Sequence, residues 1–247
     1  VFPWAVAGWE ITDGGKTWTF ELRKGMKWSD GTPLTMEDVS WTWNNIASNE
    51  ELFPTAPLAI SLEGQLPVFK EIDDLHWSLT FHKPFFVFKQ LLPQTDMGGD
   101  RMIQPAHYLK QFHIDYADAD ALQAIVDAGP NLDANQVAFT KKTEWASWVD
   151  AFKHHYHAYF EDSSLPSLNP WILKTRFGVQ RMIAERNPYY WGVDQAGNQL
   201  PYVDRLILNC VENAEVVQLK AIAGELTAQG RHMKMSSYPV LQENRER

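Results

Sequence analysis

The chain has 247 residues, 45% of them hydrophobic and 21% charged, which is the composition of a globular protein and excludes a disordered one. A formal net charge of −9 argues against a nucleic-acid partner, because phosphate contacts need a clustered excess of Lys and Arg. Cys210 is the single cysteine, so a disulfide framework and a cysteine-based zinc site are excluded.

The first predicted element is a β-hairpin over residues 8–25. Trp18, Phe20 and Leu22 alternate with polar residues, so they are expected on one face of a strand. The intervening "TDGGK" supplies the glycines that a turn with positive φ requires.

A helix is expected to begin after Thr35. Thr35 and Asp38 have the spacing of a capping box, in which each side chain bonds the backbone of the other. Val39, Trp43 and Ile46 then recur on one helix face and are expected to be buried. Because the acidic residues of this segment all have a turn or capping role, we interpret the segment as scaffold rather than as a site.

The remaining elements mix helices with mostly antiparallel strands. A second hairpin is predicted over 68–84, an apolar helix over 85–92 and a short helix after Pro105. Residues 118–160 have a helical pattern broken by a turn at 128–135. Strands at 179–186 and 205–211, a helix at 214–224 capped by Asn213, and a further strand at 225–230 complete the prediction of an α/β fold.

Catalytic and metal-binding motifs are weak. His154 and His157 are three residues apart, but no H-E-x-x-H pattern or suitably spaced carboxylate accompanies them, so a helix surface is favoured over a metal site. The chain lacks a G-x-S-x-G elbow and a phosphate loop, and Glu161 and Asp162 are interpreted as loop acids. We therefore predict no catalytic residue and no cofactor, which favours a binding protein over an enzyme.

The 11 tryptophans allow two interpretations. They can fill a large core, or they can form a stacking surface for sugars and other flat ligands. Core packing is favoured for any single tryptophan.

Four motifs follow one another in the first 39 residues: "WEI" at 9–11, "GKTWTF" at 15–20, "LRKG" at 22–25 and "DGTPLTMEDV" at 30–39. In this order they resemble the signature of the extracytoplasmic solute-binding proteins of oligopeptide-type ABC transporters, family 5. The later motifs "LPSLNPW", "ERNPYYWGVD" and "LPYVDRL" continue the resemblance, which covers nearly the whole chain.

The resemblance implies a type II periplasmic-binding-protein-like α/β fold, in which two hinged lobes enclose a solute. Residues 1–205 would form most of lobe I, and 206–247 the crossover and the start of lobe II. Family members are longer, so the chain is expected to be a fragment without its signal segment. The implied partners are a peptide or oligosaccharide solute and the permease subunits of an ABC importer. The whole protein is expected to be monomeric, and either periplasmic or lipid-anchored at the cell surface.

Four residues are candidates for contact with the solute by this resemblance. Phe53 lies in the loop after the first helix, and Met97 lies in the "PQTDMGG" loop. Asn169 and Trp171 stand where the family has a glycine-rich turn near its ligand. Trp171 is either a stacking platform or packs under the hinge. Two other functions remain open: a carbohydrate-active hydrolase with tryptophan-lined subsites, and a receptor that presents solute to a sensor.

Overall fold

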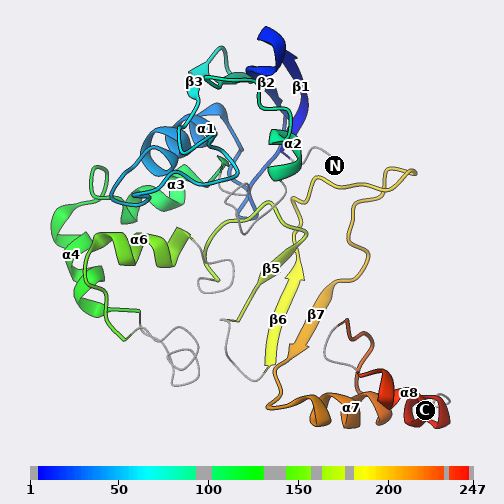
Figure 1. The fold of residues 1–247 in the computed structure, drawn as a ribbon. Coiled ribbons are helices and arrows are strands. Elements are labelled where there is room, and N and C mark those ends of the chain that lie inside the picture. Colours follow the sequence, from blue (N-terminus) through cyan, green and yellow to red (C-terminus); the bar gives the residue numbers. More distant parts are fainter. Residues whose placement is uncertain are drawn as a thin grey trace.

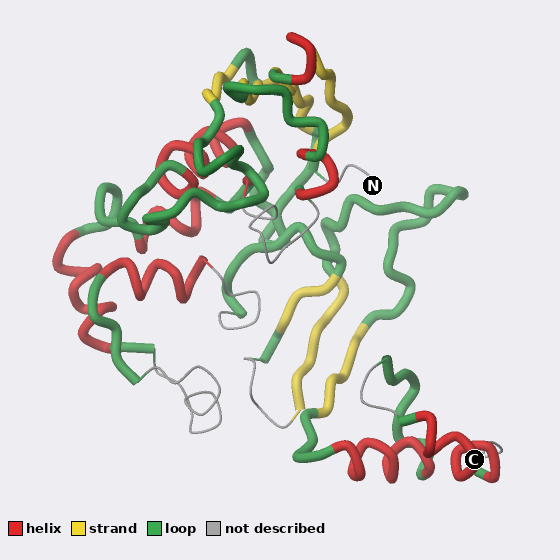
Figure 2. Tube along the Cα trace, viewed as in Figure 1, coloured by secondary structure: helices red, strands yellow, loops and turns green. Residues whose placement is uncertain are grey.

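The computed structural model describes residues 5–92, 102–130, 143–156, 163–175, 181–230 and 234–244. Figure 1 shows an N-terminal sheet, a group of helices beside it, and a second sheet that leads into the C-terminal helices. Figure 2 shows that loops make up much of the chain between these parts. Within the described ranges, no helix has the length and apolar character needed to cross a membrane.

The N-terminal sheet is antiparallel with strand order β1-β2-β4-β3. Its strands are β1 (Val6–Thr12), β2 (Thr17–Leu22), β3 (Val68–Glu71) and β4 (His76–Thr80). Both predicted hairpins are therefore confirmed, and the central pairing joins β2 to β4. The turn between β1 and β2 is the 3-10 helix η1 (Asp13–Gly15), in which Gly14 has the predicted positive φ, 62°.

Aromatic side chains fill the core on one face of this sheet. Trp18 and Phe20 of β2 are 1% and 3% exposed, which confirms the predicted apolar face. The Phe20 and Trp77 rings stack across the strands with centroids 5.3 Å apart. Phe88, in the short helix α2 (Phe88–Leu91), packs edge-on against the Trp18 ring in this core. The predicted helix over 85–92 is thus confirmed in position but is shorter than expected.

The predicted scaffold helix is α1 (Met36–Thr42), followed without a break by the π-helix η2 (Trp43–Ala47). The capping box between Thr35 and Asp38 is present, and the predicted stripe of Val39, Trp43 and Ile46 is buried. The π-helical geometry was not expected. It turns the Asn45 carbonyl toward the neighbouring helices, where it accepts a hydrogen bond from His113 Nε2 at 3.2 Å.

A second cluster forms among the helices beside the first sheet. These are α3 (Ala106–Leu109), the 3-10 helix η5 (Lys110–Phe112), α4 (Ala119–Ala128) and α6 (Trp148–Tyr156). Trp41, Ile46, Leu109 and Phe152 are at its centre. The predicted break after residue 128 is confirmed, since α4 ends before Gly129, whose φ is +67°.

Asp38 joins these parts. Its carboxylate is 4% exposed and accepts hydrogen bonds from Trp28 Nε1 at 3.1 Å, Thr35 N at 3.0 Å and Ala106 N at 3.0 Å. Burial raises the pKa of Asp38, while these three hydrogen bonds act in the opposite direction. The carboxylate therefore connects the turn before α1 to the start of α3.

The second sheet is antiparallel with order β5-β6-β7. It comprises β5 (Trp171–Leu173), β6 (Arg181–Arg186) and β7 (Arg205–Asn209). It is followed by α7 (Ala214–Ile222), the 3-10 helix η6 (Met235–Ser237) and α8 (Tyr238–Glu243). Asn213 caps α7 as predicted, by accepting from Val216 N at 3.0 Å. The strand predicted over 225–230 is wrong, because this segment is a loop after α7.

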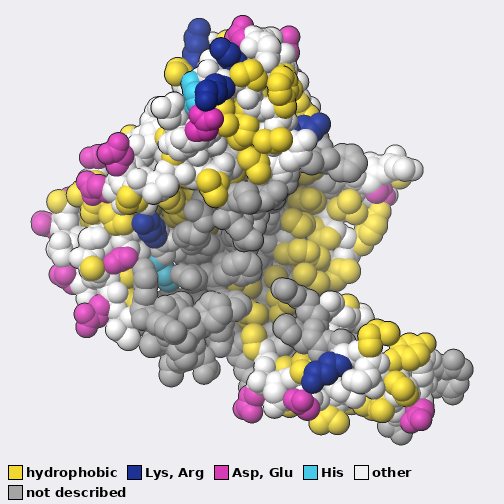
Figure 3. Space-filling view, viewed as in Figure 1, with side chains coloured by type: hydrophobic (Ala, Val, Ile, Leu, Met, Phe, Trp, Pro, Cys, Tyr) yellow, Lys and Arg dark blue, Asp and Glu magenta, His cyan; other side chains and the backbone are white. Residues whose placement is uncertain are grey.

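The C-terminal part is less buried than the rest. Ile207, Leu208, Leu219 and Tyr238 are exposed, and α7 has no buried residue. Figure 3 shows hydrophobic side chains gathered at this end of the molecule. Together the two parts confirm the predicted mixed α/β class.

Candidate functional site

The candidate residues Asn169 and Trp171 lie in and next to a loop where the two hydrophobic clusters meet. Leu165 belongs to the cluster of α3 and α6, and Leu168 packs against the cluster of the first sheet. Ser167 N donates a 3.0 Å hydrogen bond to Ser29 Oγ, in the turn before α1. The segment that leads to Trp171 is therefore attached to both clusters.

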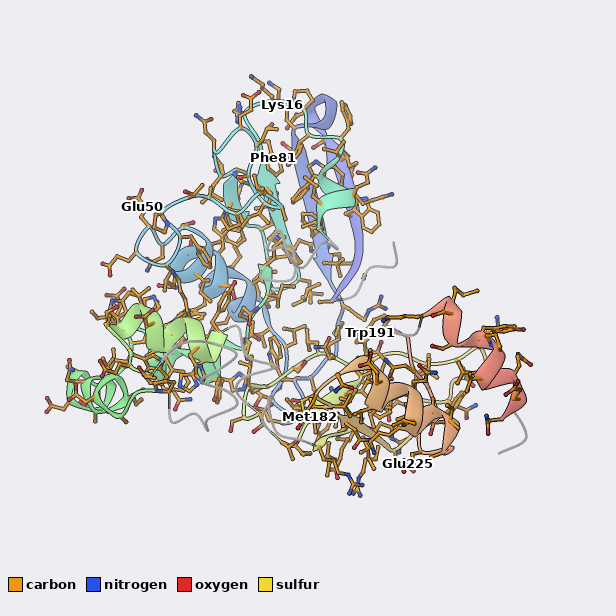
Figure 4. The ribbon with its side chains drawn as sticks, turned by 60° about the horizontal axis from the view of Figure 1, so that its bottom comes forward. Lys16, Glu50, Phe81, Met182, Trp191 and Glu225 are labelled. Carbon is orange, nitrogen blue, oxygen red and sulfur yellow. The ribbon has the colours of Figure 1, made fainter. Side chains whose placement is uncertain are left out.

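Trp191, in the loop after β6, also packs against the first cluster. The Arg23 guanidinium lies 5.2 Å from the centroid of its ring. In the view of Figure 4, Trp191 lies between Phe81 of the N-terminal part and Met182 of β6.

Trp171 is the first residue of β5 and pairs with Arg186 of β6. It is half-buried, unlike Trp18, Trp41 and Trp77, which are core residues. Trp171 is therefore partly accessible to solvent. Asn169, two residues earlier, is also half-buried, and its backbone N–H donates to Ser167 Oγ at 3.0 Å.

Phe53 occupies a different environment. Its ring packs edge-on to Tyr156 of α6, with centroids 6.1 Å apart, and Lys153 Nζ lies 5.8 Å from its centroid. It belongs to the helical cluster, on another element from Asn169 and Trp171. Met97 lies outside the described residues. The structure thus brings two of the four candidates together, and their role in binding stays a prediction.

Asn187 is the residue of this region that the sequence interpretation missed. It follows β6 directly and is 0% exposed. Its side-chain Nδ2 donates to the carbonyl oxygens of Ser167 and Asn169, and its backbone N–H donates to that of Pro170. The motif "ERNPYYWGVD" drew attention to this position, but nothing in the local pattern indicated which loop its side chain would contact.

A surface hollow of about 500 Å³ lies at the end of β6 and the start of β7, and Arg186, which pairs with Trp171, is one of its lining residues. It is lined by two cross-strand ion pairs, Arg205–Glu185 at 3.0 Å and Arg186–Asp204 at 3.7 Å. These opposite charges offer both donors and acceptors to a polar solute, and they include no candidate from the sequence.

The histidine-rich segment makes aromatic contacts. His155 stacks on Phe112 with centroids 3.7 Å apart, and His154 lies 5.4 Å from the Trp145 ring, while His157 is outside the described residues. In the part of the chain that the structure describes, no three His, Cys, Asp or Glu residues gather as a cation site.

Comparisons with known proteins agree with this fold. The family model described as bacterial extracellular solute-binding proteins, family 5 Middle, matches residues 1–246. The periplasmic α-galactoside-binding protein of Rhizobium meliloti is 27% identical over 83% of this chain and 25% of its own length. The periplasmic oligopeptide-binding protein OppA of Escherichia coli is 34% identical over 42% of this chain and 23% of its own length.

Solved structures give the same result. A structure of an oligopeptide-binding protein OppA has a TM-score of 0.79 and 34% identity, over 98% of this chain and 36% of that one. The periplasmic binding protein MelB of Agrobacterium fabrum, in complex with stachyose, has the same fold with a TM-score of 0.65 at 23% identity, over 97% of this chain and 31% of its own. The chain thus spans about a quarter to a third of these relatives' lengths. It belongs to the bacterial extracellular solute-binding proteins of family 5.

Proposed function

We propose that this chain is part of the substrate-binding component of an ABC importer, which captures a solute and delivers it to a membrane permease. The observation that carries the proposal is the family match over residues 1–246, together with a similar fold over 98% of the chain.

The proposed solute is an oligopeptide or an oligosaccharide. Two relatives support these classes, because one is named for α-galactosides and another for oligopeptides. Trp171, a half-buried aromatic residue, suits stacking against a sugar ring or a flat side chain. The half-buried Asn169 adds an amide that can both donate and accept hydrogen bonds. Phe53 and Met97 remain further candidates for contact.

The proposed mechanism is closure of two lobes around the solute. Residues 1–205 would form most of lobe I, and 206–247 the crossover and the start of lobe II. Exposed Ile207, Leu219 and Tyr238 support this division, because apolar side chains at this end suit a surface that the rest of a second lobe covers. A solute that contacts both lobes only when they are closed shifts the open–closed equilibrium toward the closed form.

Binding without catalysis follows from the same proposal. The family and the relatives above are named as binding proteins, which supports a role in which no bond is broken. The relatives are periplasmic, and we place the whole protein in the periplasm or, lipid-anchored, on the cell surface. Its proposed partners are permease subunits rather than nucleic acid, and it would act as a monomer.

A thermal-shift screen of the full-length protein tests this proposal. A solute that binds only the folded protein raises its melting temperature by mass action. We expect a concentration-dependent increase with an α-galactoside such as raffinose or with short peptides such as trialanine. If no member of broad peptide and glycan libraries raised the melting temperature, the proposal would be rejected.

A further inference from the structure

The segment 167–171, here called the 167–171 loop, is held chiefly by one residue, Asn187. Asn187 Nδ2 donates to Asn169 O at 3.0 Å and to Ser167 O at 3.4 Å. Asn187 N donates to Pro170 O at 2.9 Å. Three carbonyl groups of the loop therefore depend on a single residue.

Asn187 is itself fixed in place. It is 0% exposed, and its Oδ1 accepts a hydrogen bond from Tyr189 N at 2.9 Å. This bond leaves Nδ2 facing the loop, so the amide orientation is set by the donors and acceptors around it. Asn187 also directly follows Arg186, the residue paired with Trp171. The hydrogen bonds from Asn187 to the loop are therefore next to the first residue pair between β5 and β6.

The loop depends on these hydrogen bonds from Asn187 because it has no regular secondary structure of its own before Trp171. Backbone carbonyls that lack a ladder partner are satisfied by side chains, by other backbone groups or by water. Ser29 Oγ holds the other side of the loop by accepting from Ser167 N. Asn187 is thus the side-chain donor that fixes the segment before β5, which contains Asn169 and leads directly into Trp171.

We propose that Asn187 is a positioning residue for solute binding: it contacts no solute, but it holds the 167–171 loop so that Asn169 and Trp171 are presented in a fixed geometry. This inference rests on the proposed function, because it assigns those two residues to the binding surface. Binding is strengthened when the contacting groups are held in place before the solute arrives.

Two substitutions distinguish the effect of losing the Asn187 Nδ2 donor from the effect of losing the packing of the side chain. Asn187→Ala removes all side-chain hydrogen bonds. Asn187→Asp keeps the size and the acceptor for Tyr189 N but sets a carboxylate against the carbonyls of Ser167 and Asn169. Such a carboxyl group will have a raised pKa, because two acceptors oppose its ionised form. When it is protonated, it can again donate one hydrogen bond to the loop.

Thr42→Val is the matched control. Thr42 is 0% exposed on α1, where its Oγ1 donates to Asp38 O and accepts from Gln104 N. The substitution therefore removes buried hydrogen bonds of a similar kind in the other part of the molecule.

The test uses the full-length protein and two measurements. Hydrogen exchange of the 167–171 loop should accelerate about 10- to 100-fold in Asn187→Ala, since two part-buried carbonyls lose their donor and the local structure is weakened by a factor of this size. Affinity for raffinose or trialanine, measured by calorimetry, should fall about 10-fold, whereas Thr42→Val should retain both loop protection and affinity. In Asn187→Asp, affinity and loop protection, the latter taken relative to the intrinsic exchange rate at the same pH, should both recover as the pH falls from about 8 to about 5. Asn187→Ala should show no such recovery.

The outcomes are distinguishable. Unchanged hydrogen exchange of the 167–171 loop in Asn187→Ala would overturn the inference that Asn187 holds this loop. Faster exchange with wild-type affinity would overturn its role in binding. If the wild-type protein bound neither peptides nor glycans, the proposed function would fail, while the exchange measurement would still decide whether Asn187 holds the loop.

Discussion

Replacing Asp38 with alanine is expected to destabilise the protein by about 2 to 5 kcal/mol. The Asp38 carboxylate accepts from Trp28 Nε1 and Ala106 N in buried surroundings, and from Thr35 N in a partly buried position. Each buried donor left without an acceptor costs about 1 to 3 kcal/mol, and two such donors give most of the expected loss. Thr35 N adds less, because it is closer to solvent.

Urea unfolding followed by circular dichroism measures this loss as a lower transition midpoint. Asp38→Asn should fall between wild type and Asp38→Ala, because the amide retains one acceptor oxygen. Asp30→Ala is the control, since Asp30 bonds His107 at 2.7 Å with both side chains about a third exposed, and such pairs contribute at most about 1 kcal/mol.

The same variants test whether the segment around α1 is scaffold or site. The folded fraction of Asp38→Ala should bind solute with wild-type affinity. If the stability of Asp38→Ala were within about 0.5 kcal/mol of wild type, the expected contribution of these hydrogen bonds would be refuted. Normal stability with lost affinity would mean that Asp38 is a ligand-binding group.

Four further predictions concern the helices and the candidate site. Burial lowers the pKa of His113 below its usual 6.5, so the unfolded chain binds the proton more readily and stability should fall as the pH drops below 6.5. Urea midpoints measured across this range should therefore depend less on pH in His113→Gln than in the wild-type protein. Equal slopes of midpoint against pH in the two proteins would contradict this. Phe152→Ala, at a 0% exposed position, should cost about 3 to 5 kcal/mol in thermal or urea unfolding, and a loss below about 1 kcal/mol would show that the helical cluster is not closely packed. Asn213→Ala should cost about 1 kcal/mol and speed hydrogen exchange in α7, while Asn213→Asp should preserve the cap; equal exchange in the two variants would argue against capping. Trp171→Ala should lower solute affinity, measured by calorimetry, by more than Phe53→Ala does, because the Phe53 ring packs against α6. A larger loss of affinity in Phe53→Ala would place the binding surface at the helical cluster instead.

Local features of the fold could be predicted from the sequence where neighbouring residues determine them. The alternation of Trp18 and Phe20 indicated both the strand and its buried face. The spacing of Thr35 and Asp38 predicted a capping box that the structure contains. Asn213 was identified as a cap because its side chain bonds a backbone group only three residues away.

Features that depend on contacts between distant segments could not be predicted in this way. Asp38 was expected to cap its own helix, but its bond to Ala106 N joins residues 68 positions apart. Asn187 lies in a recognisable motif, yet its contacts with the 167–171 loop depend on how β5 and β6 pair. The strand expected over 225–230 is a loop, which shows that short segments with little periodicity do not determine their own structure.

We propose that the whole protein captures a solute and releases it unchanged. Titration calorimetry of the full-length protein with the solute found by thermal shift, followed by mass spectrometry of the solute recovered after denaturation, tests this most directly. We expect saturable binding of about one solute per chain and recovery of the intact molecule. Recovery of a cleaved or otherwise altered product, or no saturable binding of any peptide or glycan, would contradict it.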